Sequence, residues 1–211
     1  MSRATKQLTI AAIAIAIIGA SAVWIYRQNF AQPAYEPTIQ VQTVVGEVLA
    51  EETIKLIGTA GQIVVITLEH GQSGELDTHY ESFKDGLKKS SIKILRTDTI
   101  SAGKSKYGPG SGMSGRRFVK VVTQFAQADA IVSLVGLPDA DEAELKELKG
   151  RPLPKVVAFA RDPKPLPELF ANQWAHVAIV PRRQGNPTAP ANPKTSREWF
   201  DKQYEIVRAS R

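Results

Sequence analysis

The stretch "QIVVITLE", Gln62 to Glu69, is an almost unbroken run of β-branched and other apolar residues. Such a run is typical of a strand that is buried on both faces of a parallel sheet, whereas a strand with one face in water alternates apolar and polar residues. Four later stretches also have strand character: "IKILRTDTI", "DAIVSLVG", "KVVAFA" and "HVAIVPR". The stretch from Gln62 therefore predicts one buried strand of a parallel sheet.

Helical patterns alternate with these strands, in the stretches "HYESFKDGLKK", "RRFVKVVTQFAQ", "DEAELKELKG" and "LPELFANQ". Before the first strand, "VVGEVLAEETIKLIG" places apolar residues on one helical face and ends at Gly58. Strand and helix alternate repeatedly, which predicts an α/β domain over residues 44–182 with a doubly wound, flavodoxin-like parallel sheet of about five strands.

An apolar run near the N-terminus, Leu8 to Tyr26, is close to the roughly 20 residues that a transmembrane helix needs. Trp24 and Tyr26 close the run as interfacial aromatic anchors. The two cations before the run outweigh Arg27 after it, so the positive-inside rule places the short end in the cytoplasm. We expect a single-pass signal anchor over residues 1–27 in the inner (cytoplasmic) membrane, with the C-terminal domain in the periplasm or outside.

A removed secretory signal is the competing interpretation, because "ASA" at Ala20 to Ala22 resembles a cleavage site. The apolar run continues beyond Ala22, which favours the uncleaved anchor, and both interpretations export the domain. Two prolines in "QNFAQPAYEPTIQ" break any helix and predict a stalk over residues 28–43.

The composition excludes several function classes. The 211 residues include no cysteine, so disulfides, thiol catalysis and thiolate metal sites are excluded. The formal charge of +6 is not interleaved with aromatic residues, so we expect no nucleic-acid partner. In an exported domain this basic excess favours membrane headgroups or an acidic protein partner.

The sequence from Gly46 to Asp98 resembles the second lobe of the type I periplasmic sugar-binding proteins and the related repressor ligand domains. The motifs that carry the likeness are a Gly-x-x-x-Ala helix opening at Gly46 and Ala50, then "GQIVVIT", "SFKDGLKK" and "IKIL". A weaker likeness extends to Arg182. The resemblance implies a lobe of that fold. Two such lobes enclose the ligand in the family, whereas this sequence has room for one.

The departures from the family lie in its ligand-binding positions. The resemblance places the family's sugar-binding arginine at His79, and "GLPDAD" and "AFARD" replace its Asn/Asp pair and its "GFD". Asp139 and Asp162 lie close to those positions. Most polar groups of a sugar site are therefore missing, and a site built to bond hydroxyls loses heavily when they go unpaired.

The stretch "GPGSGMSGRR", Gly108 to Arg117, resembles a phosphate-binding loop in its glycines. Arg116 and Arg117 stand where such a loop needs Lys and Ser or Thr, so no nucleotide site is expected. Ligands of open α/β sheets bind beyond the carboxyl ends of the strands, so this loop lies at the relevant edge. By the same rule, four segments share that edge: "HGQSGELDTH", "SAGKSKYGPGSGMSGRR", "GLPDAD" and "RDPKP". Three interpretations stay open: a solvated connection, a docking surface and a small-anion site.

No enzyme, metal or cofactor site is expected. His70, Glu69, Asp77 and His79 are close in sequence, but their spacing matches no dedicated metal motif. The serines lack a G-x-S-x-G context. We therefore predict no catalytic residue, no metal and no cofactor.

The C-terminal residues 183–211 are predicted to be a Pro-rich linker and a docking segment. Thr195 and Glu198 have capping-box spacing, and an apolar stripe follows at Trp199, Phe200, Tyr204 and Val207. The stripe either folds back on its own sheet or docks on a partner, and the sequence favours neither.

Together these features predict a non-catalytic, membrane-anchored exported subunit that is a scaffold or interaction module of a larger, hetero-oligomeric envelope membrane complex. The alternative is a periplasmic sugar-like solute receptor that dimerises to recreate a two-lobed cleft. The residues expected to contact a partner are Arg116, Arg117, Trp199, Phe200 and Tyr204.

Overall fold

The computed structural model describes residue 21 and residues 38–71, 73–101, 113–138, 142–182, 186, 188–190 and 192–210. Apart from residue 21, the predicted anchor, with Trp24 and Tyr26, lies outside the described residues, as do residues 108–112 of the glycine-rich stretch. In the described ranges, no helix is both long enough and apolar enough to cross a membrane. The anchor therefore stays a prediction.

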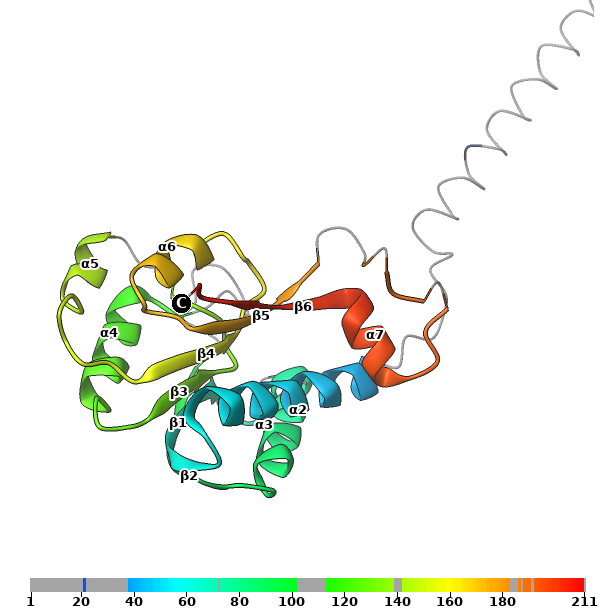
Figure 1. Cartoon of the computed structure of the whole chain (residues 1–211), viewed down its shortest axis with the longest axis horizontal. Helices are drawn as coiled ribbons and strands as arrows, with labels where there is room; N and C mark the ends of the chain where they lie inside the picture. The colour runs from blue at the N-terminus through cyan, green and yellow to red at the C-terminus, as the bar shows by residue number, and fades with distance from the viewer. Residues whose placement is uncertain are drawn as a thin grey trace, which may run out of the picture. The chain divides into compact units, whose positions relative to one another are not determined.

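A six-stranded sheet forms the centre of the domain, in the order β2-β1-β3-β4-β5-β6 (Figure 1). Five strands are parallel, as predicted: β1 (Ala60–Leu68), β2 (Ser91–Ile100), β3 (Ala130–Ser133), β4 (Lys155–Phe159) and β5 (Val177–Pro181). The sixth strand, β6 (Tyr204–Arg208), is antiparallel to β5. The α/β class and the strand-helix alternation are thus confirmed, and the expected all-parallel sheet of about five strands gains an antiparallel edge.

β1 is buried on both faces, as its sequence predicted. Its residues from Ile63 to Ile66 are all fully buried. Val65 pairs with Thr97 of β2 on one side and with Val132 of β3 on the other. A central strand with helices on both faces of the sheet is shielded from water on each face, which explains why β1 is apolar at consecutive positions.

Helices cover both faces of the sheet. They are α2 (Thr38–Ile57), α3 (Gly74–Leu87), α4 (Gly115–Gln124), α5 (Glu142–Lys146), α6 (Leu166–Ala171) and α7 (Ser196–Gln203). α2 and α3 lie on one face, and α4, α5 and α6 lie on the other (Figure 1). α2 begins at Thr38, before the expected domain start at residue 44, because Val41 already packs into the core.

Small residues let α2 and α3 pack closely. A Cβ added at Gly46 of α2 would lie 2.0 Å from Ser82 Oγ and 2.4 Å from the carbonyl oxygen of His79. A Cβ added at Gly86 of α3 would lie 2.6 Å from the Ala50 Cβ. The Gly-x-x-x-Ala motif therefore has a packing function here, since larger side chains would force the two helices apart.

The C-terminal segment differs from the predicted single helical stripe. The capping box is confirmed, because Thr195 Oγ1 accepts a bond from the Glu198 amide while the Glu198 carboxylate accepts one from the Thr195 amide. α7 ends at Gln203, however, and Tyr204 opens β6. The segment enters the sheet because β5 would otherwise present an unpaired edge, which β6 covers with backbone hydrogen bonds.

Candidate functional site

The carboxyl ends of β1 to β5 lie at one edge of the sheet because these strands are parallel. The segments after β1, β2, β3 and β4 therefore meet there, as the sequence analysis expected. We call this the carboxyl edge. Its described parts are residues 69–71, 73, 101, 113–114, 134–138 and 160–165.

A charge pair joins two of these segments. The Arg161 guanidinium, after β4, lies 2.5 Å from a carboxylate oxygen of Glu75, in the first turn of α3. Ser73 caps α3 by accepting a hydrogen bond from the Leu76 amide, which fixes the turn that carries Glu75. The side chains are 46% and 30% exposed, so both stay accessible to a ligand.

His79, in the same helix α3, is fully buried. Its Nε2 bonds the side-chain oxygen of Gln42 in α2, and its ring meets the edge of Phe159 at 4.9 Å between centroids. Burial, and after it the charge of Arg161, lowers the pKa of His79 to about 3, so the ring is neutral. The amide oxygen of Gln42 can only accept, so Nε2 carries the proton and Nδ1 is an acceptor. Nδ1 has no hydrogen-bond partner among the described residues.

This environment changes what the resemblance implied for His79. The family's arginine at that position binds sugar hydroxyls, whereas His79 has no exposed surface in this structure. It joins α2, α3 and β4 below the carboxyl edge. A direct contact between His79 and a ligand would first require the groups above it to move.

The histidines and carboxylates after β1 do not assemble into a metal site. His70 Nδ1 lies 2.9 Å from Asp77 Oδ1, and the other Asp77 oxygen accepts the Gly71 amide at 3.0 Å. These bonds hold the turn between β1 and α3, while His79 is turned into the core. In the part of the chain that the structure describes, no group of three or more His, Asp or Glu could hold a metal ion.

The two arginines of the glycine-rich stretch both bind carboxylates of this domain. Arg117 contacts Asp98 of β2 at 2.7 Å and 3.2 Å, and Arg116 lies 3.4 Å from Glu144 of α5. Ser114 caps α4 by accepting from the Arg117 amide. The rest of that stretch, residues 108–112, lies outside the described residues, as do residues 102–107 before it.

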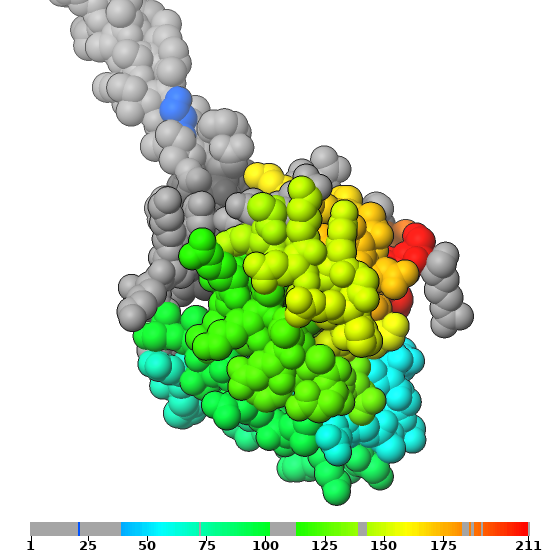
Figure 2. Space-filling view, turned by 90° about the vertical axis from the view of Figure 1, so that its left-hand side faces the viewer, coloured from blue at the N-terminus to red at the C-terminus, as the bar shows by residue number. Residues whose placement is uncertain are grey.

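A hollow of about 700 Å³ lies between α4 and α5, on the face shown in Figure 2. Its walls carry charges of both signs: Arg116, Lys120, Glu144, Glu147 and Arg151. Mixed charges of this kind are typical of a solvated surface, so the hollow adds no defined ligand chemistry.

Three further polar residues at or near the carboxyl edge have local functions or lie outside the described residues: Asp162, Ser133 and Asp139. Asp162, after β4, accepts a hydrogen bond from the Lys164 amide at 3.1 Å, which stabilises the turn. Ser133, at the end of β3, donates to the Gly136 carbonyl at 2.6 Å. Asp139 lies outside the described residues.

The apolar stripe of the C-terminal segment packs largely on its own domain. Phe200 is buried, and its ring stacks on Tyr204 at 5.4 Å, while Tyr204 meets Phe159 at 5.8 Å. Trp199 is only half-buried, with the Lys202 ammonium 5.0 Å from its ring centroid. Phe200 thus packs inside the domain, as the internal-packing alternative expected. A partner contact by Arg116, Arg117, Trp199 or Tyr204 stays a prediction.

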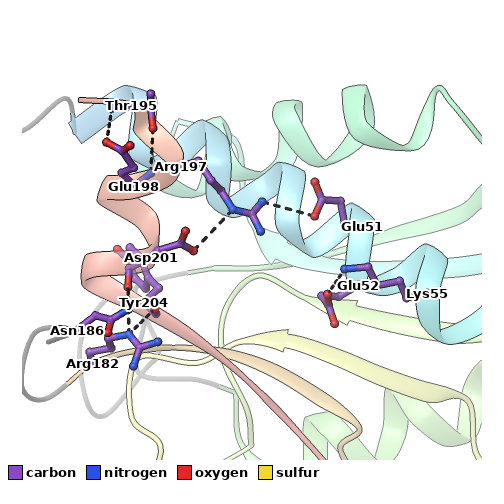
Figure 3. A network of polar contacts seen from close by, with 10 residues as sticks. All are labelled: Glu51, Glu52, Lys55, Arg182, Asn186, Thr195, Arg197, Glu198, Asp201 and Tyr204. Carbon is purple, nitrogen blue, oxygen red and sulfur yellow. Dashed lines mark hydrogen bonds and ion pairs between the residues drawn. The ribbon is translucent and has the colours of Figure 1, made fainter. Parts of the chain in front are cut away.

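Polar contacts fasten the same segment to α2 and β5 (Figure 3). Arg197 lies between Glu51 of α2 and Asp201 of α7, at 3.5 Å and 3.7 Å. Arg182 donates to the Tyr204 carbonyl at 2.9 Å and to the Asp201 carbonyl at 3.2 Å. The segment thus packs on its own domain, while its docking on a partner stays a prediction.

Sequence reasoning missed the Glu75–Arg161 pair. It placed both loops at the carboxyl edge, but 86 positions separate the two residues, and no pattern in the sequence pairs Glu75 with the Arg161 of "AFARD". Opposite charges in two loops that the topology brings together were the available signal.

Comparison with known proteins identifies the fold. No family model and no curated protein matches the sequence. Among solved structures, a XylFII molecule matches at a TM-score of 0.55 with 17% identity, covering 80% of this chain and 61% of that one. A XylFII–LytSN complex matches at 0.53 with 17% identity, covering 80% and 60%. AraP, an arabinose-binding protein from Geobacillus stearothermophilus, matches at 0.53 with 15% identity, covering 80% and 61%.

These matches confirm the resemblance at the level of fold. The domain is similar to a lobe of the periplasmic sugar-binding proteins, as the Gly46–Asp98 motifs indicated. The match spans about three fifths of the length of those structures.

Proposed function

We propose that this domain is a non-catalytic recognition module of the sugar-receptor type, which binds a polar, hydroxyl-rich ligand at its carboxyl edge. The observation that carries the proposal is the Glu75–Arg161 pair, which lies where β1 and β4 end. The likeness to an arabinose-binding protein supports a sugar as the ligand class. This is the alternative that the sequence analysis set beside its scaffold hypothesis.

The pair offers the chemistry that a sugar needs. A carboxylate accepts hydrogen bonds and a guanidinium donates them, so adjacent hydroxyl groups find both partners in one place. Ser73 fixes the helix turn below Glu75. The pair is thus held in position before the ligand arrives, which lowers the entropy that binding costs.

A second surface would complete the site. The solved structures that match this chain extend beyond the part that matches it. Sugar receptors of this fold enclose the ligand between two lobes. We propose that a second chain, either another copy or a partner, faces the carboxyl edge. The predicted anchor over residues 1–27 would hold both at the outer face of the inner membrane.

The second candidate function is the scaffold or interaction module of an envelope membrane complex. One observation favours it: four charged residues in the elements that flank the carboxyl edge already bond other residues of this domain, namely Glu75, Asp77, Asp98 and Arg117. A neighbour of the same fold occurs in a XylFII–LytSN complex, which is compatible with protein contacts through such a lobe. In this case Arg116, Trp199 and the lipid bilayer are the contacts to test.

A thermal-unfolding panel separates the two candidates. The full chain in detergent is melted with arabinose, glucose and galactose, each over a concentration series. A ligand at a hundred times its dissociation constant adds about 2.7 kcal/mol to the free energy of unfolding. A concentration-dependent rise with one sugar supports the receptor function, and unchanged melting with all three favours the scaffold.

A further inference from the structure

A pocket of about 500 Å³ lies at the opposite, amino edge of the sheet. It is formed where α2 ends, where β4 and β5 begin and where β6 ends. The volume is within the range of small-molecule sites. None of its residues takes part in the carboxyl edge, so its ligand would be independent of the function proposed above.

Positive charge dominates the wall of this pocket. Lys55, Lys155 and Arg208 carry three positive charges, and Glu52 carries one negative charge, so two positive charges remain. Glu52 is only 1% exposed, and both its oxygens are engaged: Oε1 by Lys55 at 2.8 Å, and Oε2 by Arg208 at 2.7 Å and 2.8 Å. The carboxylate therefore orients two cations while leaving the third, Lys155, without an ion pair among the described residues.

His176 adds a hydrogen-bond donor beside Lys155. Its Nδ1 accepts a bond from the Val156 amide at 3.2 Å, so the neutral ring carries its proton on Nε2. Burial, followed by the charge of Lys155, lowers the pKa of His176 to about 4. His176 lines the pocket, and its neutral ring has the Nε2–H group as its hydrogen-bond donor. An ammonium and an N–H donor side by side suit a compact anion.

We propose that the amino-edge pocket binds a small anion through a carboxylate or phosphate group, with Lys155 and His176 Nε2–H as the primary contacts and Arg208 beside them. Both groups carry several negatively charged oxygens, on a trigonal carbon or a tetrahedral phosphorus, and these oxygens accept several hydrogen bonds at once. Gln173 also lines the pocket, and its positive φ of 59° marks the turn before β5.

The test uses the full chain with histidine labelled in the ring nitrogens. Inorganic phosphate and succinate are titrated separately at constant ionic strength, and the His176 ring signals are followed by NMR. We expect a saturable shift of His176 with at least one of the two anions, and the anion that gives it identifies the ligand class. No saturable shift with either anion overturns the proposal.

Two matched variants test the contact itself. Lys155→Gln should weaken binding by about tenfold or more, because it removes a charge-assisted hydrogen bond. Lys93→Gln makes the same change in net charge at an exposed residue of β2, outside the pocket, and should leave the dissociation constant unchanged. Equal weakening by both variants would mean a general charge effect and would contradict a defined site.

Discussion

Arg208, in β6, bonds the carboxylate of Glu52, in α2, at 2.7 Å and 2.8 Å, although 156 positions separate the two residues. The pair joins the first helix of the domain to its last strand. Because Glu52 is buried, its charge needs partners, and Arg208 supplies one of them beside Lys55. The last strand therefore contributes to the stability of the core.

Removing Arg208 tests this connection. Arg208→Ala should lower the free energy of unfolding by about 1–3 kcal/mol, because the Glu52 carboxylate keeps only Lys55 as a partner. Arg197→Ala is the control, since its ion pairs at 3.5 Å and 3.7 Å are half-exposed and should cost less than about 1 kcal/mol. Urea unfolding measures both, and an equal loss in the two variants would contradict the special position of Arg208.

Val65, in the middle of β1, tests the buried strand. Val65→Asp places an unpaired charge between two layers of helices, and we expect a domain without a cooperative thermal transition. Lys93→Asp, on the exposed side of β2, should keep a native circular dichroism spectrum and transition. A native transition for Val65→Asp would show that this strand tolerates water on one face.

His79 predicts a pH dependence of stability. Its folded pKa of about 3 lies below the unfolded value of 6.5, so the unfolded chain binds more protons between these values. The stabilising contribution of the neutral His79 ring is complete above pH 6.5 and is lost as the pH falls toward 3. Over that range the free energy of unfolding falls by up to about 1.4 kcal/mol per pH unit. His79→Gln should flatten the stability curve between pH 6.5 and 5. Urea unfolding across that range measures the slope, and identical slopes in both proteins would contradict the buried neutral ring.

The fold was predictable from the sequence where one residue pattern allows one structure. The run from Ile63 to Ile66 suits only a strand buried on both sides, and Thr195 with Glu198 marks a helix start wherever that helix packs. Tyr204 and Val207, by contrast, fit both a helical stripe and a short strand. The unpaired edge of β5 decides between the two, and that edge exists only in the folded sheet.

The candidate site was less predictable than the fold. The topology placed the loops of Glu75 and Arg161 at one edge of the sheet. The positions of their side chains, however, depend on tertiary packing, which cannot be read from the sequence alone. The resemblance identified the position of His79, yet not its burial. That burial results from the close approach of α2 and α3 at Gly46 and Gly86.

Phe200 and Trp199 separate internal packing from docking. Phe200→Ala should lower the free energy of unfolding by about 3–5 kcal/mol, because the ring is buried against Tyr204. Trp199→Ala should cost less, and if this face docks, it should also release partners that co-purify with the full chain from membranes. Unchanged co-purification with Trp199→Ala would assign the half-buried ring to the domain alone.

The most direct test of the receptor function is isothermal titration of the full chain with arabinose, performed on the wild type, Arg161→Ala and Lys93→Ala. Arg161 carries the proposed ligand surface, whereas Lys93 is an exposed cation near the start of β2, outside the carboxyl edge. We predict a saturable heat for the wild type and for Lys93→Ala, and binding weakened by about tenfold or more for Arg161→Ala. Absence of binding in the wild type, or equal binding by all three proteins, would contradict ligand recognition at the carboxyl edge.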